Sequence, residues 1–207
     1  MTYIFDFDGT LVDSMPTFAQ AMVNIFKQEQ LPYPDDFVKI ITPLGYKGTA
    51  QYAIKCGYTK DADTFVSDAA AAMVPAYLYD IPLKADVYEK LQQLKSEGHS
   101  LNVLTASPHV VLDPCLKRVG VYDLFDHIWS CEDFGLTKAD VPLYEKVAAA
   151  LNEKLEDCIF LDDNIGSVST AKKAGMTAVA VYDSTSEDMV EKMKAIADRY
   201  IYSFAEL

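Results

Sequence analysis

Short apolar runs alternate with amphipathic stretches along most of this chain. Residues 3–5 are aromatic or β-branched, and comparable runs recur at 101–105, 127–129, 158–162, 177–181 and 200–202. Runs of this composition predict strands, six in all. Between the later runs, apolar residues recur at helical spacing, which predicts helices over 86–96, 110–119, 141–151, 168–174 and 186–197. Strand and helix in alternation predict an α/β fold, with a parallel sheet covered by helices on both faces.

The stretch between the first apolar run and residue 81 lacks any strand pattern. Helical spacing predicts four helices there, over about 16–30, 35–41, 49–56 and 61–79. Pro16 suits the first turn of its helix, whereas Pro75 should kink or shorten the last one. We therefore expect a core domain of residues 1–14 and 82–207, interrupted by an all-helical cap of residues 15–81.

Charge and cysteine usage narrow the class of protein. The 207 residues carry a net charge of −13, whereas a nonspecific nucleic-acid binder would carry a basic face. No apolar run approaches the length needed to cross a bilayer, and no signal peptide is visible. The four cysteines form no C-x-x-C pair, which favours reduced thiols in a cytoplasmic protein. From the charge and the short apolar runs, we expect neither a nucleic-acid nor a membrane partner.

The first predicted strand leads directly into two acids. Asp6 and Asp8 are separated by one residue, so an extended backbone points both side chains to the same side. Gly9 follows and permits a turn that a side chain would obstruct. Two carboxylates in this position could hold Mg2+, which prefers oxygen ligands, or one could serve as a nucleophile. Ordinary turn acids are the alternative, but they rarely continue a buried aromatic run.

Other polar residues are predicted at the same edge of the sheet. Thr105 and Asp162–Asp163 end two later strands, and Lys138 precedes a helix. Ligands of open parallel sheets bind beyond the carboxyl ends of the strands. Taken alone, each position has an ordinary structural interpretation: Thr105 as a strand-end hydroxyl, Asp162–Asp163 as a helix N-cap, and Lys138 as a solvated lysine. Together they place acids, a hydroxyl and an amine at one edge.

These residues resemble the haloacid dehalogenase-like superfamily of hydrolases over nearly the whole chain. The resemblance rests on four motifs, which are Asp6-Phe7-Asp8-Gly9-Thr10-Leu11-Val12-Asp13-Ser14, Leu104-Thr105-Ala106-Ser107, Gly135-Leu136-Thr137-Lys138, and Phe160-Leu161-Asp162-Asp163 leading to Gly175. The helical insert resembles the cap of the phosphoglycolate phosphatase and β-phosphoglucomutase-like branch. The resemblance implies a Rossmann-like core and a Mg2+-dependent phosphatase acting on a small phosphorylated metabolite.

Two positions depart from the pattern of the family. The family often has Lys-Pro-x-Pro where this chain has Lys138-Ala139-Asp140-Val141-Pro142. A second acid is common in the fourth motif at the position that holds Ser167. We therefore expect one metal contact to be missing there, or to come from Asp162 or water.

The resemblance also assigns roles at the predicted metal site. Asp6 would attack phosphorus and form an aspartyl phosphate, and Asp8 would act as general acid and then as base. Mg2+ would bind Asp6, the backbone carbonyl of Asp8, and Asp163, with Asp162 beside it.

Phosphate and leaving-group contacts are assigned in the same way. Thr105 and the backbone at Ala106 and Ser107 would hold phosphoryl oxygens, and Lys138 would supply positive charge and pair with Asp6. In the cap, Lys47 is a candidate phosphate contact, although alone it reads as a solvated lysine. Met15, Tyr46 and Lys47 are candidates for choosing the leaving group.

Several alternatives stay open from the sequence. A phosphomutase of the β-phosphoglucomutase type would keep both acids, whereas a dehalogenase would lack Asp8. A noncatalytic phosphoacceptor or binding protein is a further alternative, although a receiver domain would need no helical insert. The substrate is undetermined, and either a monomer or a homodimer is compatible with the sequence.

Overall fold

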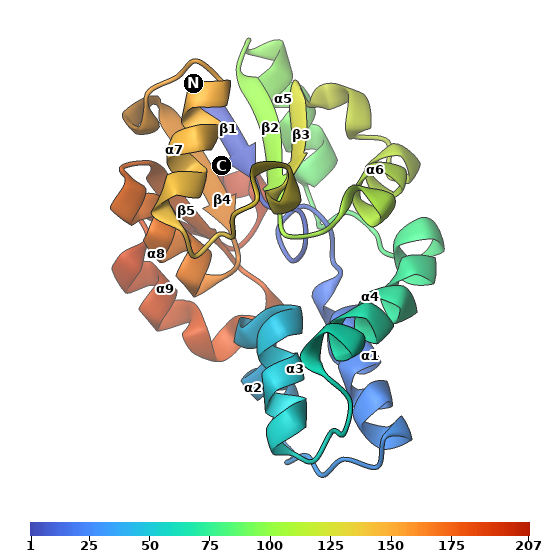
Figure 1. Ribbon diagram of the computed structural model, residues 1–207. Coiled ribbons are helices and arrows are strands. Elements are labelled where there is room, and N and C mark those ends of the chain that lie inside the picture. Colours follow the sequence, from blue (N-terminus) through green and yellow to red (C-terminus); the bar gives the residue numbers. More distant parts are fainter.

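One six-stranded parallel sheet forms the centre of the molecule (Figure 1). The computed structural model describes residues 1–207, apart from the side chain of Pro43. The strands lie in the order β3-β2-β1-β4-β5-β6. Their bounds are β1 Thr2–Phe5, β2 Ser100–Thr105, β3 His127–Ser130, β4 Cys158–Asp162, β5 Thr177–Val181 and β6 Arg199–Ile201. The predicted α/β fold with a parallel sheet is confirmed.

Apolar residues alternate between the two faces of the sheet. Tyr3 and Phe5 of β1 belong to a large buried cluster that includes side chains of α5 (Val87–Ser96) and α6 (His109–Arg118). Ile4 points to the opposite face and packs with side chains of α7 (Val141–Ala150) and α8 (Ile165–Ala174). A third cluster joins α8, β5 and α9 (Val190–Ile196). Helices therefore cover both faces, as expected when a strand alternates apolar side chains.

Two core helices differ in extent from their predicted ranges. Helix α8 begins at Ile165, three residues before the predicted start, because the Asn164 side chain accepts hydrogen bonds from the amides of Gly166 and Ser167. The stretch predicted as a helix from residue 186 is divided. A 3-10 segment, Ser184–Met189, contains the nonhelical backbone of Ser186 and precedes α9.

The insertion after β1 is entirely helical. It contains α1 (Met15–Gln28), α2 (Phe37–Ile41), the 3-10 segment Thr42–Leu44, α3 (Gly45–Lys55) and α4 (Ala62–Tyr79). Figure 1 shows these helices grouped together beyond the ends of the strands, in the lower part of the view. Helix α3 begins at Gly45, where the sequence predicted a break. Helix α4 continues through Pro75 to Tyr79, because burial of Phe65, Ala69, Met73 and Tyr77 holds its inner face. Division into domains at residues 15 and 81 remains a prediction.

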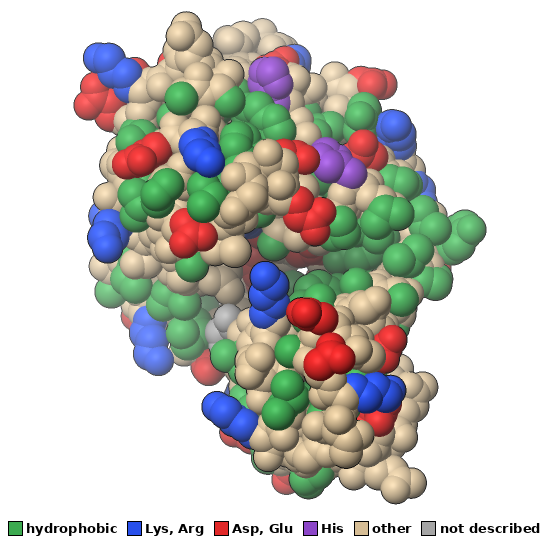
Figure 2. All heavy atoms as spheres, in the orientation of Figure 1, with side chains coloured by type: hydrophobic (Ala, Val, Ile, Leu, Met, Phe, Trp, Pro, Cys, Tyr) green, Lys and Arg blue, Asp and Glu red, His purple; other side chains and the backbone are tan. Residues whose placement is uncertain are grey.

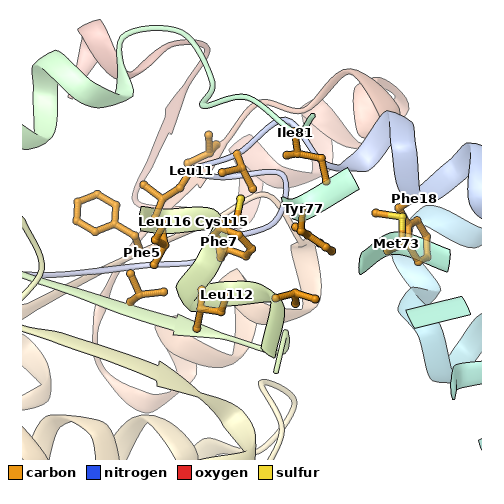
Figure 3. Packing of buried hydrophobic residues seen from close by; sticks show 14 of the residues in the cluster. Phe5, Phe7, Leu11, Phe18, Met73, Tyr77, Ile81, Leu112, Cys115 and Leu116 are labelled. Carbon is orange, nitrogen blue, oxygen red and sulfur yellow. The ribbon is translucent and has the colours of Figure 1, made fainter. Parts of the chain in front are cut away.

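The two crossings between insertion and sheet lie side by side. Val12 forms a bridge with Leu83, and the amide of Asp13 donates to the carbonyl of Pro82. Figure 3 shows that Phe7, beyond β1, lies close to Tyr77 of α4, and their rings stack at 5.8 Å. The buried cluster of the sheet thus continues into the inserted helices, which gives the insertion a packed base.

All four cysteines are free, and those at 115, 131 and 158 are buried. Among the described residues, no helix has both the length and the apolar character required to traverse a membrane.

Candidate active site

A cavity of about 260 Å³ lies where the carboxyl ends of β1, β2 and β4 meet the inserted helices. Figure 2 shows the surface hollowed between the two parts of the molecule. Most of the side chains predicted to act on phosphate line this cavity: Asp6, Asp8, Thr105, Ala106, Ser107, Lys138, Asp162 and Asp163. Met15 and Tyr46, predicted to choose the leaving group, line it as well. The parallel sheet brings together residues up to 157 positions apart because its strand ends share one edge.

Three carboxylates converge at the base of the cavity. Asp6, Asp162 and Asp163 each offer an oxygen, and these oxygens lie within 4.8 Å of one another. All three side chains are buried. Lys138 Nζ lies 2.5 Å from Asp6 Oδ1 and 2.8 Å from Asp162 Oδ2. One lysine therefore contacts two of three buried acids, which leaves the cluster with excess negative charge.

Burial and mutual repulsion change the protonation of this cluster. Burial, opposed by the Lys138 charge but reinforced by Asp162 and Asp8, raises the pKa of Asp6 to about 7. Burial, together with the charges of Asp162 and Asp6, also raises the pKa of Asp163. Burial opposes the charged form of Lys138, but Asp162 and Asp6 outweigh it and raise the pKa of that amine. The lysine is therefore charged at neutral pH.

The raised pKa predicts how metal-free stability depends on pH. The pKa of Asp6 is about 7 in the folded chain and about 3.9 in an unfolded one. Folding therefore favours the protonated acid, so ionisation of Asp6 destabilises the fold as pH rises from about 4 to about 7. Asp6→Asn, which cannot ionise, should gain stability relative to the parent across this window. Urea unfolding of both proteins in chelator at pH 5 and pH 7.5 measures the difference, and a gain that shrinks with pH would contradict it.

Asp8 forms its hydrogen bonds with hydroxyl groups and not with members of the carboxylate cluster. Its Oδ1 accepts hydrogen bonds from Ser14 Oγ at 2.7 Å and from the Tyr77 hydroxyl at 2.6 Å. Its Oδ2 accepts one from Ser107 Oγ at 2.5 Å. Hydroxyl groups can accept as well as donate, so all three can hold Asp8 in either protonation state. The three hydroxyl groups therefore fix the position of the Asp8 carboxyl group.

Gly9 lets the backbone pass beside the carboxylate cluster. Its φ is +71°, and a Cβ built there would lie 2.4 Å from Asp163 Oδ2. A side chain would therefore meet both a disfavoured backbone conformation and the acid. This close approach supplies the physical reason for glycine after Asp8.

Gly9→Ala should destabilise the protein and displace Asp163. The left-handed backbone alone costs about 1–2 kcal/mol for a residue with a Cβ, and the clash adds to that cost. Gly120→Ala is the matched control, because Gly120 has φ +79° with nothing near its Cβ position. Urea unfolding should show the larger loss for Gly9→Ala, and equal losses would mean that the contact with Asp163 is unimportant.

The loop after β2, predicted to hold phosphoryl oxygens, lies at the cavity and contains an internal hydrogen bond. Thr105 and Ser107 are buried and line the cavity together with Ala106. The amide of Ser107, predicted to bind phosphate, donates to Thr105 Oγ1 at 3.0 Å. Thr105 therefore organises the loop after its strand in this structure.

Lys47 and Ser167 occupy different surroundings. Lys47 is exposed and is not among the described residues that line the cavity, and its role as a phosphate contact remains a prediction. Ser167 is buried at the cavity wall near the start of α8. The cluster that can hold a metal consists of Asp6, Asp162 and Asp163, without a further acid at Ser167.

Sequence reasoning missed Lys84, a partly buried lysine. Lys84 Nζ donates to the carbonyls of Gly9 and Tyr182, at 2.5 and 2.6 Å, and to Asp183 Oδ2 at 3.0 Å. Its charge opposes the rise in the pKa of Asp163. Lys84 therefore ties the loop after β1 to the end of β5. Its sequence, Leu83-Lys84-Ala85, carries no signal that distinguishes it from a surface lysine.

Comparison with known proteins identifies the family. Residues 3–181 match the family model described as haloacid dehalogenase-like hydrolase. The chain belongs to the haloacid dehalogenase-like hydrolase family. The resemblance stated from the four motifs is thereby confirmed.

Curated relatives of this haloacid dehalogenase-like hydrolase are named as phosphatases. The validoxylamine A 7'-phosphate phosphatase of Streptomyces hygroscopicus subsp. limoneus is 26% identical, over 86% of this chain and 84% of that protein. The phosphoglycolate phosphatase of Caulobacter vibrioides is 27% identical, over 100% of this chain and 88% of that protein. These relatives support the predicted enzyme class, a phosphatase of this family that acts on small phosphorylated compounds.

A solved structure has the same fold. The crystal structure of a predicted phosphoglycolate phosphatase from Haemophilus somnus superposes with a TM-score of 0.82, and covers 99% of this chain and 95% of that chain. Its sequence is 22% identical. The likeness confirms the core sheet with its helical insertion.

Proposed function

We propose that this hydrolase is a Mg2+-dependent phosphatase that forms an aspartyl phosphate on Asp6. The observation that carries the proposal is the convergence of Asp6, Asp162, Asp163 and Lys138 in one cavity that also contains Asp8. The substrate would be a monophosphate ester of a small metabolite. The cavity volume of about 260 Å³ lies just below the range of about 300–1,000 Å³ typical of small-molecule sites.

The carboxylate cluster fits a hard divalent cation. Its acids are buried close together, and Lys138 is the cation that contacts them among the described residues. Asp162 already accepts hydrogen bonds at both oxygens, from Lys138 and from the amide of Asn164. Asp6 and Asp163 would therefore hold the ion, with Asp162 orienting the lysine. Mg2+ at this place would neutralise negative charge on the carboxylates and on the transferring phosphoryl group.

The two transfer steps use Asp6 and Asp8. A carboxylate oxygen of Asp6 attacks phosphorus, and the bond from phosphorus to the ester oxygen breaks. Asp8 gives its proton to that oxygen, so the alcohol leaves neutral. Asp8 then takes a proton from water as the water oxygen attacks phosphorus. The bond from phosphorus to Asp6 breaks, which restores the Asp6 carboxylate, leaves Asp8 protonated as at the start, and releases inorganic phosphate.

Lys138 and the loop after β2 position the phosphoryl group. Lys138 holds Asp6 Oδ1 and fixes the direction of the nucleophile, while its charge offsets the approaching phosphate. The Thr105–Ser107 loop faces the same cavity and offers hydroxyl and backbone groups. Helices of the insertion close the opposite side and would exclude bulk water.

A phosphate-release assay with trapping of the intermediate tests the proposal. Purified protein should release phosphate from 4-nitrophenyl phosphate or acetyl phosphate with Mg2+, and EDTA should stop release until Mg2+ is restored. Asp8→Asn should slow the second step and accumulate protein heavier by one phosphoryl group, detected by intact-mass spectrometry. Turnover without a metal would contradict the proposal, as would a phosphoryl group mapped to another residue. With a hexose 1-phosphate, an isomerised product instead of phosphate would indicate a mutase.

A further inference from the structure

The cavity has two halves of different chemistry. Its charged residues all come from the core: Asp6, Asp8, Lys138, Asp162 and Asp163. The half contributed by the insertion is lined by Met15, Phe18, Thr42, Leu44, Gly45, Tyr46 and Tyr77. Among the described lining residues, this second half carries neither an acid nor a base. A phosphoryl group at Asp6 would leave its alcohol portion facing the uncharged half.

The cation in the cavity is already engaged. Lys138 lies within 2.8 Å of both Asp6 and Asp162, and any phosphate would add negative charge beside it. A second anionic group on the substrate, such as a carboxylate, would face the apolar half with no cation to pair with. Burying an unpaired charge costs several kcal/mol after relaxation. A cationic group would meet the same difficulty, because that half has no acid among its described lining residues.

Two phenol groups give the uncharged half its polarity. The Tyr77 hydroxyl donates to Asp8, and Tyr46 lines the same part of the cavity. Burial and the nearby Asp8 raise the pKa of both hydroxyls, so both remain neutral at physiological pH. Phenol oxygens can accept hydrogen bonds from a substrate hydroxyl. Phe18 packs edge-on against the Tyr46 ring at 5.0 Å, which adds an apolar wall.

We propose that the leaving group is a small, uncharged alcohol bearing hydroxyl groups, so that the substrates are monophosphate esters of neutral polyols. This inference rests on the proposed phosphatase function and specifies its substrate class. It separates this hydrolase from enzymes whose substrate carries a carboxylate beside the phosphate, although several of its relatives are named phosphoglycolate phosphatases.

Lys47 directly follows a residue that lines the uncharged half of the cavity, so it is the first alternative to consider as a source of positive charge there. Its neighbour Tyr46 lines the cavity, whereas Lys47 is exposed outside it. If Lys47 moved into the cavity with substrate bound, it would select an anionic leaving group. The proposal therefore predicts that Lys47 contributes nothing to the preference among esters.

Three phosphate esters of similar size test the charge of the leaving group. They are 2-hydroxyethyl phosphate, phosphoglycolate and 2-aminoethyl phosphate, which end in a hydroxyl, a carboxylate and an ammonium group. We expect kcat/KM for the neutral ester to exceed each of the others by about tenfold or more, which corresponds to 1.4 kcal/mol. Glycerol 1-phosphate and 3-phosphoglycerate repeat the comparison with a larger leaving group.

The outcomes separate this inference from the proposed function. If a charged ester matches or exceeds its neutral partner, or if neither neutral ester is hydrolysed while 4-nitrophenyl phosphate is, the substrate inference is overturned and the phosphatase function stands. Failure of every ester, 4-nitrophenyl phosphate and acetyl phosphate included, would instead overturn the phosphatase function. Loss of phosphoglycolate turnover in Lys47→Ala would assign the selecting cation to Lys47 and overturn the inference.

A designed cation provides an independent test. Leu44 lines the cavity but is 42% exposed, so the fold should tolerate its replacement. Leu44→Arg should raise the ratio of phosphoglycolate to 2-hydroxyethyl phosphate turnover by about tenfold relative to Leu44→Gln, the uncharged control. An equal ratio in the two variants would show that charge in this half does not select the substrate, and would overturn the inference.

Discussion

Asp6→Asn should reduce phosphate release by at least about 10⁴-fold, comparable to the loss on removing a nucleophile in other covalent enzymes. The amide keeps the size of the carboxylate but is a far weaker nucleophile. Because the amide has nearly the same shape as the buried carboxylate beside Lys138, the substitution should leave the fold intact. Initial rates with Mg2+, together with urea unfolding, measure both properties.

Asp13→Asn is the matched control for this change. Asp13 belongs to the same motif, but its side chain is exposed and does not line the cavity. Its turnover should stay within about twofold of the parent, because surface substitutions away from structural features change little. If freshly purified Asp6→Asn retained hydrolysis at the parental rate, Asp6 would not be the nucleophile.

Lys138→Met should reduce both turnover and stability. The substitution removes the cation that contacts Asp6 and Asp162 and leaves three buried acids without it. Breaking a buried ion pair in this way costs about 3–5 kcal/mol. Turnover should fall by about 10²- to 10³-fold, the effect of losing one preorganised group that stabilises transition-state charge.

The pH dependence of this loss distinguishes electrostatics from packing. At pH 5, Asp6 is largely protonated because its pKa is about 7, so less charge is left unpaired when Lys138 is removed. The destabilisation of metal-free Lys138→Met should therefore be smaller at pH 5 than at pH 7.5. Lys154→Met is the control, since Lys154 is highly exposed and its contact with Glu156 should contribute little. An equal loss at both pH values would point to packing.

The central sheet could be predicted because its information is local. Runs such as Cys158–Asp162 and Thr177–Val181 are bounded by polar or glycine-containing segments, and the observed strands have these same limits. The start of α8 was less accessible, because it depends on which polar residue caps the helix. Asn164 does so, whereas Asp162 turns to Lys138 and to the amide of Asn164. The hydrophobic periodicity does not show which of several neighbouring polar residues caps a helix.

By itself, the sequence determined which groups can perform the chemistry, because Asp6, Asp8, Thr105, Lys138 and the Asp162–Asp163 pair end or follow recognisable elements. Only the tertiary structure decided how these groups are paired. Lys84 and Tyr77 reach Gly9 and Asp8 across more than sixty residues, and Lys47 lies outside the cavity. Such contacts depend on where the inserted helices pack against the sheet. The spacing of residues along the chain does not predict that packing, because the buried contacts form between segments that are distant in sequence.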